Sequence, residues 1–222
     1  MKRQQYVVIG LGRFGSSVAM ELVQLGYEVL GIDRNEEVVY TMGDFLTHTV
    51  TADATDEEML RSLGIRNFDC GIVAIGDDIQ MSILATILLK EMGLKSVVAK
   101  AISTLHGRAL EKLGVDRVIY PERDMGVRVA HQLVTPNLVD YIELSKDYRI
   151  VELKVPSHLH GHLIGDLNPR ARFSCSIVAL QKDTGVLIAP TAMDRLDEGD
   201  TMVIIGANEN IQEFEDVINE ED

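Results

Sequence analysis

The residues best suited to chemistry form a glycine-rich turn near the start of the chain. Gly10, Gly12 and Gly15 follow the G-x-G-x-x-G pattern directly after a short apolar run at residues 6–9. The first glycine allows a sharp turn, the second lets a pyrophosphate approach the backbone, and the third lets a helix pack closely on the strand. The start of that helix offers free N–H groups and the positive end of its dipole. The pattern predicts a phosphate-binding loop if a strand precedes it and a helix follows it.

An acid stands at the distance from this loop that a nucleotide site requires. Asp33 follows a second apolar run at residues 28–32. An acid at the end of that strand binds the ribose hydroxyls, and its charge would repel a 2′-phosphate. The adjacent positive charge of Arg34 slightly weakens this argument against a 2′-phosphate. All adenosine nucleotides carry the same ribose, so Asp33 does not distinguish NAD from ATP, ADP or AMP.

Two basic side chains are candidates for contact with phosphate. Arg13 lies inside the glycine loop, where a guanidinium can reach a distal phosphate, and Lys100 comes late in the fifth apolar run. For both residues a solvated side chain is an equally good interpretation. Asp53, in the segment Asp53-Ala54-Thr55, could hydrogen-bond an adenine edge or cap the next helix. For Asp77 and Asp78, helix capping is the better interpretation.

The elements that must position these residues alternate regularly over the first ~120 residues. Apolar runs without polar alternation predict strands that are covered on both faces. Helical patterns separate them, and the candidate ligands fall at the ends of the strands. We therefore expect an α/β fold that begins with a Rossmann-like, doubly wound parallel sheet. The predicted strands are residues 6–9, 28–32, 47–51, 70–75, 97–101 and 117–120.

The pattern changes after Pro121. Residues 122–134 predict a helix with a broad apolar stripe, which we interpret as a linker packing against something further, such as a second copy. Most of the remaining chain reads as strands with a hairpin turn at 183–185. Asn210, with Glu213 three residues later, is the expected start of a closing helix. The predicted organisation is a nucleotide-binding domain at 1–121, a linker helix at 122–134 and a small α+β C-terminal domain at 135–222.

Composition limits the classes of partner. The 222 residues carry a formal net charge of -14, which disfavours nucleic acid and anionic lipid as partners. No apolar run reaches the ~18 residues that span a bilayer, and the basic start MKRQQ leads directly into the first strand. We expect a cytoplasmic protein without direct membrane insertion. Cys70 and Cys175 read as buried, reduced thiols.

The sequence lacks the residues that an enzyme would add to this loop. No tyrosine has a lysine four positions later, and there is no P-loop motif. His158, His160 and His162 alternate without an accompanying cysteine or fixed carboxylate, so a metal site there is disfavoured. A nucleotide fold without catalytic groups indicates a sensor. The alternative is an NAD-dependent oxidoreductase whose second domain supplies the substrate site. The net charge and the lack of a winged helix argue against a transcription regulator.

Several motifs, taken in order, resemble a known family. YVVIGLGRFGSSVAMELVQLGYEVLGID, TADATDEEML, IVAIGDD, VVAKA and VIYPE resemble the N-terminal RCK (regulator of K+ conductance) domain. RIVELKVPSHLHGHLIGDL, SIVALQKDTGVLIAP and LDEGDTMVIIGANENIQEF resemble the C-terminal RCK domain, also called TrkA-C. The chain is similar over nearly its whole length to the cytosolic regulatory subunits of Ktr and Trk potassium transporters, most of all to those of Gram-positive bacteria.

The resemblance implies an assembly and a role. These proteins form a homo-octameric ring, a tetramer of dimers, under an integral-membrane K+ transporter subunit at the inner face of the cell membrane. ATP and ADP compete for the Rossmann cleft and set the ring shape that gates ion flow, and some members bind NAD(H). No catalysis is implied. The implied nucleotide-site residues are Gly10, Leu11, Gly12, Arg13, Phe14, Gly15, Asp33, Arg34, Asp53, Ala54, Thr55, Ala74, Ile75, Gly76 and Lys100.

Two further sites are implied by the resemblance alone. Glu122 matches an acid that binds a cation such as Mg2+, Ca2+ or Na+ near the phosphates. The C-terminal domain resembles one that binds cyclic di-AMP at a dimer interface. Its implied lining is Leu163, Ile164, Asp166, Leu167, Arg170, Arg172 and Pro190. One departure is Ala52, where the family usually has glycine before the acid that we number Asp53.

Overall fold

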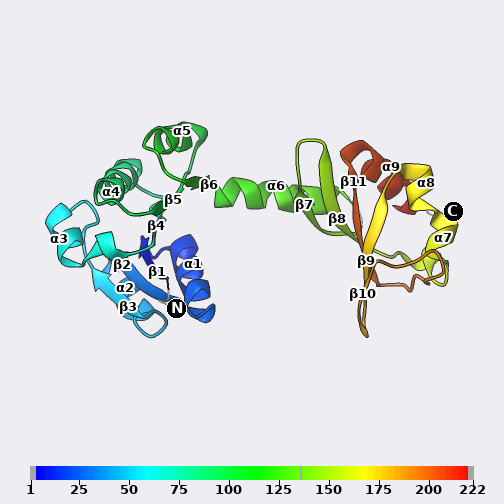
Figure 1. Cartoon of the computed structure of the whole chain (residues 1–222), viewed down its shortest axis with the longest axis horizontal. Coiled ribbons are helices and arrows are strands. Elements are labelled where there is room, and N and C mark those ends of the chain that lie inside the picture. Colours follow the sequence, from blue (N-terminus) through cyan, green and yellow to red (C-terminus); the bar gives the residue numbers. More distant parts are fainter. Residues whose placement is uncertain (1–3, 136, 220–222) are drawn as a thin grey trace. The chain divides into compact units, whose positions relative to one another are not determined.

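The computed structural model describes residues 4–135 and 137–219, and the chain divides into two compact units (Figure 1). Unit 1 is Met1–Arg123 and unit 2 is Asp124–Asp222. The boundary lies within the first turn of helix α6, Pro121–Val134. Each unit has a hydrophobic core of its own.

Unit 1 contains the predicted doubly wound parallel sheet, with the strand order β3-β2-β1-β4-β5-β6. All the pairings between neighbouring strands are parallel, and the order reverses direction beside β1, where β1 lies between β2 and β4. Ligands bind such sheets outside the carboxyl ends of the strands at this point of reversal. The strands are β1 (Gln5–Ile9), β2 (Glu28–Asp33), β3 (His48–Thr51), β4 (Cys70–Val73), β5 (Ser96–Lys100) and β6 (Arg117–Ile119).

Helices cover both faces of this sheet because alternate side chains of the strands point to opposite sides. Val8 packs with Ala19 of α1 and Met42 of α2 in one cluster, whereas Val7 and Ile9 pack with residues of α3, α4 and α5 in the other. This explains why the strands read as continuous apolar runs. The helices are α1 (Arg13–Gln24), α2 (Glu36–Met42), α3 (Glu57–Ser62), α4 (Ile79–Glu91) and α5 (Thr104–Lys112), with a 3-10 turn at Ile65–Asn67.

Helix α4 differs from its prediction. Its apolar residues run almost all round, which predicts burial on more than one side. In the structure the polar Ser82 and Thr86 are fully buried, while Ile79 and Leu84 are about 40% exposed. Burial of Thr86 is tolerated because its hydroxyl donates a hydrogen bond to the Ser82 carbonyl, 2.7 Å away. The outer apolar side of α4 is therefore uncovered in the single chain.

Unit 1 contains a buried histidine whose protonation should couple its folding to pH. His106, in the first turn of α5, is 2% exposed, and its Nδ1 accepts a hydrogen bond from the Ile102 N–H at 3.4 Å. Burial lowers the pKa of His106 below its ordinary value of 6.5. Between these two pKa values the unfolded chain binds a proton that the folded chain does not bind, so acid favours unfolding.

We expect the free energy of unfolding of unit 1 to fall as the pH drops below about 6.5. Above that pH the contribution of His106 is constant, because the side chain is neutral in both states. His106→Gln, which cannot titrate but can still accept the Ile102 N–H, should remove this part of the loss. Urea unfolding at pH 7.5 and 5.5 measures the loss of unfolding free energy in the unaltered chain and in the variant. An equally large drop in the variant would show that other groups cause it.

Unit 2 is a smaller α+β fold. Its antiparallel sheet has the order β10-β9-β11-β8-β7, and α9 packs on it through Ile211, Phe214 and Ile218. The Phe214 ring meets that of Phe173 edge to face, with the ring centroids 5.4 Å apart. The elements are β7 (Leu138–Glu143), β8 (Tyr148–Lys154), a 3-10 turn (Ser157–Leu159), α7 (Ile164–Leu167), α8 (Pro169–Phe173), β9 (Ser176–Lys182), β10 (Gly185–Ile188), β11 (Thr201–Ala207) and α9 (Asn208–Asn219).

Two features of unit 2 depart from the sequence reading. The strand β7 at Leu138–Glu143 was not distinguished, and α9 begins at Asn208 rather than at Asn210. Pro136, in the predicted boundary turn, lies outside the described residues. Among the helices that the structure describes, none combines the length and the apolar character needed to cross a membrane.

Candidate functional site

The glycine turn of unit 1 folds as its spacing predicts. Gly10 leaves β1 with a φ of 91°, and its N–H donates to the Ile32 carbonyl at 2.8 Å. A Cβ on Gly15 would lie 1.8 Å from the Gly10 carbonyl oxygen, so only glycine lets α1 pack this closely on the turn. Gly12 is the N-cap of α1, and a Cβ there would meet no atom within 4 Å. The space over Gly12 is therefore open, as the close approach of a pyrophosphate would require.

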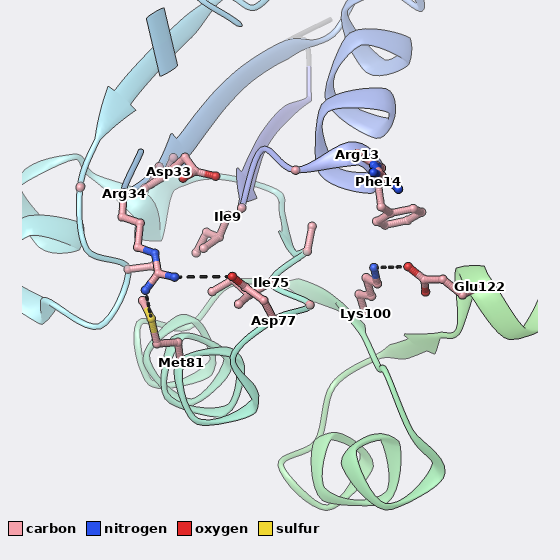
Figure 2. A pocket seen from close by; sticks show the side chains of 17 residues that line it. Ile9, Arg13, Phe14, Asp33, Arg34, Ile75, Asp77, Met81, Lys100 and Glu122 are labelled. Carbon is pink, nitrogen blue, oxygen red and sulfur yellow. Dashed lines mark hydrogen bonds and ion pairs between the residues drawn. The ribbon is translucent and has the colours of Figure 1, made fainter. Parts of the chain in front are cut away.

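A cleft of about 400 Å3 opens over this turn (Figure 2). That volume lies within the range of ordinary small-molecule sites. The cleft runs along the carboxyl ends of the strands and reaches the start of α6. It is lined by Ile9, Gly10, Gly12, Arg13, Phe14, Ile32, Asp33, Arg34, Ala52, Ala54, Ala74, Ile75, Gly76, Asp77, Met81, Lys100 and Glu122.

Asp33 is fixed by the backbone on both sides. One carboxylate oxygen accepts the Leu11 N–H at 2.7 Å, and the other accepts the Asn35 N–H at 2.9 Å. The first bond ties β2 to the glycine turn, and the second orders the residue that caps α2. Each oxygen keeps a lone pair for a further donor. Asp33 therefore lies on the cleft wall as a rigid acceptor, ready for a pair of hydroxyl groups.

The acid after β3 is used locally. Asp53 Oδ1 accepts both the Thr55 hydroxyl at 2.7 Å and the Thr55 N–H at 2.8 Å. These bonds hold the pKa of Asp53 below its ordinary value. The flanking Ala52 and Ala54 line the cleft with methyl groups, whereas Asp53 and Thr55 are not among the lining residues of the described chain. A contact between Asp53 and an adenine edge stays a prediction.

An ion pair closes the opposite end of the cleft. Lys100 Nζ lies 2.5 Å from Glu122 Oε1 and 5.9 Å from the centroid of the Phe14 ring. Lys100 is only 8% exposed, so its ammonium group is largely withdrawn from water. Its hydrogen bond holds the pKa of Glu122 below the ordinary value. Figure 2 shows this pair near Phe14 and Arg13, beside the glycine turn.

The first turn of α6, which carries Glu122, is held by an aromatic contact. The hydroxyl of Tyr120 occupies the space that a Cβ on Gly107 would need, only 1.7 Å from that position. The guanidinium of Arg123 lies over the Tyr120 ring, 3.8 Å from its centroid. The position of Glu122 opposite Lys100 is thus set by packing as well as by charge.

The structure brings most of the predicted residues to this cleft. Of those that do not line it, Leu11 fixes Asp33 and Gly15 supports the turn. Asp78 caps α4 as expected, since its side chain accepts the Met81 N–H at 3.0 Å. The capping interpretation is wrong for the neighbouring Asp77, which lines the cleft; nothing in the sequence separates these two adjacent acids. Other lining residues that were missed are Ile9, Ile32, Ala52 and Met81.

Unit 2 has a second pocket, of about 320 Å3. It contains three of the predicted residues, Ile164, Arg170 and Pro190. Leu163, Asp166, Leu167 and Arg172 are not among the residues that line it in the described chain. Asp166 instead accepts the Leu163 N–H at the start of α7. The remaining lining residues, which the sequence did not single out, are Gly165, Asn168, Pro169, Cys175, Ser176, Ile177, Thr191 and Ala192.

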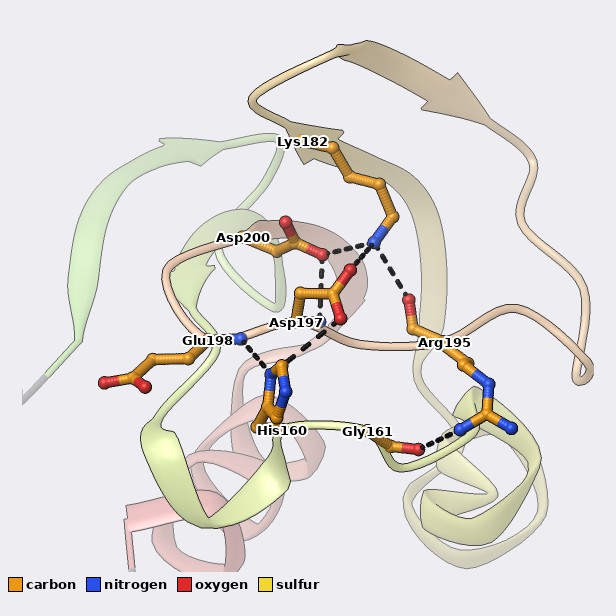
Figure 3. A network of polar contacts seen from close by, with 7 residues as sticks. All are labelled: His160, Gly161, Lys182, Arg195, Asp197, Glu198 and Asp200. Atoms are coloured by element: carbon orange, nitrogen blue, oxygen red, sulfur yellow. Dashed lines mark hydrogen bonds and ion pairs between the residues drawn. The ribbon is translucent and has the colours of Figure 1, made fainter.

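A polar network fixes the loop that forms one wall of this second pocket (Figure 3). Lys182 donates to Asp200 at 2.6 Å, to Asp197 at 2.8 Å and to the Arg195 carbonyl at 3.1 Å. Burial works against the charge, but the two carboxylates outweigh it and raise the pKa of Lys182. The same loop includes Pro190, Thr191 and Ala192, which line the pocket.

Comparisons with known proteins agree with the two units. The TrkA-N domain model matches residues 6–121, and the TrkA-C domain model matches residues 148–219. The chain is 46% identical to the Ktr system potassium uptake protein A of Bacillus subtilis over 215 residues, 97% of each chain. It is 41% identical to the Ktr system potassium uptake protein C of the same organism over 213 residues, 96% of each chain.

A solved structure is similar over almost the whole chain. The GsuK channel bound to NAD matches with 25% identity and a TM-score of 0.54. The match covers 98% of this chain and 39% of the channel chain. A second structure, GsuK bound to ADP, covers 59% of this chain and 33% of the channel chain, with 26% identity and a TM-score of 0.51.

Proposed function

The chain belongs to the family of potassium uptake proteins that join a TrkA-N domain to a TrkA-C domain, and on this premise we propose that it is a nucleotide-sensing regulatory subunit. In this role it binds an adenine nucleotide in the cleft of unit 1 and gates a membrane-embedded K+ transporter subunit. The observation that carries the proposal is that the open glycine turn and the fixed Asp33 carboxylate face one cleft, in a chain from a potassium uptake family. We assign no catalysis to the cleft.

The residues of the cleft fit an adenine nucleotide from end to end. The alanines after β3, together with Arg34 and Met81, form an end suited to the base. Asp33 offers two fixed acceptors to the ribose hydroxyls. The open space over Gly12 and the free N–H groups at the start of α1 suit a pyrophosphate. Arg13 and Lys100 would hold the distal phosphates.

Lys100 links the phosphate end of the cleft to helix α6. Its ammonium group is bound to Glu122, and the same group faces the cleft. A phosphate near Lys100 would compete with Glu122 for the same N–H donors, since both are anionic acceptors. Occupancy of the cleft would therefore alter what holds the first turn of α6 in unit 1. This competition is the step by which we propose that the cleft controls the transporter.

ATP and ADP are the proposed ligands, and NAD(H) is the alternative. The related GsuK channel has been solved with NAD and with ADP, which supports an adenine nucleotide but not one particular ligand. All three ligands share the groups that Asp33 and the glycine turn would bind. ATP differs from ADP only in its terminal phosphate. A residue that distinguishes the two must therefore reach beyond the pyrophosphate bound at the glycine turn.

Arg13 is the residue that we expect to detect the terminal phosphate. Arg13→Ala should weaken ATP binding by roughly 10-fold, the 1.5 kcal/mol or so of a charge-assisted hydrogen bond, and ADP binding much less. Calorimetric titration of both nucleotides measures the ratio of the two dissociation constants. Arg66→Ala, which removes an arginine that does not line the cleft, is the matched control. An unchanged ratio in Arg13→Ala would identify Arg13 as a solvated loop residue.

The cation at Glu122 stays a prediction. Its carboxylate is bound to Lys100, and no cluster of three or more metal-ligating side chains is found among the described residues. One carboxylate paired with an ammonium group does not form a cation site by itself. We therefore derive no step that depends on Mg2+, Ca2+ or Na+.

We also propose that the pocket of unit 2 binds cyclic di-AMP. Arg170 supplies a cation for a phosphate, while Ile164, Ile177 and Pro190 supply an apolar floor for a base. Arg170→Ala should weaken binding of cyclic di-AMP by about 10-fold or more, as expected for loss of a charge-assisted contact. The nucleotide bound in unit 1 should be unaffected, which serves as the internal control. Equal affinity in the variant and the unchanged chain would remove Arg170 from the site.

Assembly into a homo-octameric ring, a tetramer of dimers, remains part of the proposal. Apolar residues are exposed on α4, α5 and α6, and several of them are more than 70% exposed in the single chain: Leu105, Leu133 and Val134. Such surfaces are usually covered by a partner. We place the ring at the inner face of the cell membrane, held there by the K+ transporter subunit.

A further inference from the structure

Arg34 spans the mouth of the cleft at the end opposite Lys100. Its Nη1 donates to Met81 Sδ at 3.4 Å, and its Nη2 lies 3.5 Å from Asp77 Oδ2. Arg34 follows β2, whereas its two partners lie just before and within α4. Figure 2 shows the guanidinium joined to both partners, on the side of the cleft away from Lys100. The side chain therefore bridges two walls of the cleft.

The third wall at this end is apolar. Ala52 and Ala54 line it with methyl groups, which cannot hydrogen-bond a base. The acid between them, Asp53, already accepts two hydrogen bonds from Thr55 on one oxygen. A base entering here would meet methyl groups, the thioether of Met81 and the guanidinium of Arg34. These groups favour contact with the face of a ring.

We propose that Arg34 is the base-recognition residue of this cleft, stacking its guanidinium on the adenine ring, and that Asp77 and Met81 position it; this rests on the nucleotide site proposed above. A guanidinium is planar and delocalised, so it stacks on an aromatic face more effectively than an ammonium group. Because Asp77, just before α4, and Met81, within α4, already hold it across the cleft, less side-chain freedom is lost when a base binds.

An arginine at this position could instead bind the 2′-phosphate of a nucleotide such as NADP. The surroundings of Arg34 disfavour it. Asp33 occupies the place of the ribose hydroxyl ligand, and Asp53 and Asp77 add two more negative charges around the guanidinium. A 2′-phosphate would have to displace Asp77 and lie beside Asp33. The geometry therefore favours stacking on the base.

The test compares three probes on the full chain: 5′-AMP, ribose 5-phosphate, which lacks the base, and adenosine 2′,5′-bisphosphate. Each is measured by displacement of a fluorescent ADP analogue. The variants are Arg34→Ala, Arg34→Lys, Asp77→Ala and the double variant. The side chains of Arg34 and Asp77 are 60% and 80% exposed, so these changes should leave the unfolding midpoint unaltered.

We expect Arg34→Ala and Arg34→Lys to weaken 5′-AMP by about 10-fold while ribose 5-phosphate binds as before. Asp77→Ala should weaken 5′-AMP by about 3-fold, with no further loss in the Arg34→Ala background, because it acts through Arg34. Unchanged 5′-AMP affinity in Arg34→Ala, full affinity in Arg34→Lys, or an equal loss for ribose 5-phosphate would each overturn the proposal. So would tight binding of the 2′,5′-bisphosphate that disappears in Arg34→Ala. If the unaltered chain bound no probe, the nucleotide site itself would be refuted, which is a separate outcome.

Discussion

Gly12→Ala is expected to remove most nucleotide binding without destabilising the protein. Gly12 has an ordinary φ of -65°, and an added Cβ would meet no protein atom within 4 Å. Alanine therefore fits the folded chain, and we expect the free energy of unfolding to change by less than about 0.5 kcal/mol. The same methyl group fills the space that a pyrophosphate needs. The affinity of the protein for the nucleotide should fall by roughly 10- to 100-fold, which corresponds to the 1–3 kcal/mol cost of overpacking.

Gly15→Ala is the matched variant, because it changes the third glycine of the same turn. Its Cβ would lie 1.8 Å from the Gly10 carbonyl oxygen, so α1 would have to move away from the turn. We expect a loss of about 3 kcal/mol of folding stability or more, together with the loss of binding. Urea unfolding and calorimetric titration of ADP separate the two effects. Full ADP affinity in Gly12→Ala would show that no pyrophosphate approaches this turn.

Asp33→Ala should also weaken nucleotide binding strongly. It removes both proposed ribose acceptors and leaves the Leu11 and Asn35 N–H groups without their present partner. We expect ADP affinity to fall by roughly 100-fold, the 1.5–3 kcal/mol typical of hydrogen bonds to a charged group. Glu36→Ala removes a nearby exposed acid that does not line the cleft, and it should bind ADP normally.

A change in the ligand isolates the ribose contact from this loss of local order. In the unaltered chain, 2′-deoxy-ADP should bind more weakly than ADP, because one hydroxyl is missing. In Asp33→Ala the two ligands should bind equally, since the acceptor for that hydroxyl has gone. A preference for ADP that persists in Asp33→Ala would assign the ribose to another residue.

The fold of unit 1 was predictable because its determinants are local. Apolar runs such as 28–32 and the glycines of the turn report backbone conformation and burial directly in the sequence. Asp33 could be identified by its distance from the turn. The strand predicted at 70–75 is shorter in the structure, where β4 ends at Val73, because the chain leaves the sheet there to form the edge of the cleft.

The missed features depend on contacts between distant segments. Asp77 and Asp78 look alike in the sequence, yet one caps α4 while the other faces Arg34, 43 positions earlier. The pairing of Lys100 with Glu122 depends on where α6 starts relative to β5. The exposed outer side of α4 could not be foreseen, because apolar periodicity does not say whether the covering group belongs to the same chain. The residue types alone do not show which distant segments come into contact.

The central claim is that the cleft of unit 1 binds an adenine nucleotide as a signal and leaves it unchanged. The most direct test is calorimetric titration of the purified chain with ATP and with ADP, followed by chromatography of the nucleotide recovered from the complex. We predict saturable binding of one nucleotide per chain, weakened by roughly 10- to 100-fold in Gly12→Ala, with each nucleotide recovered intact. Absence of binding, or unchanged affinity in Gly12→Ala, would contradict the site. Conversion of the nucleotide would contradict its role as a signal.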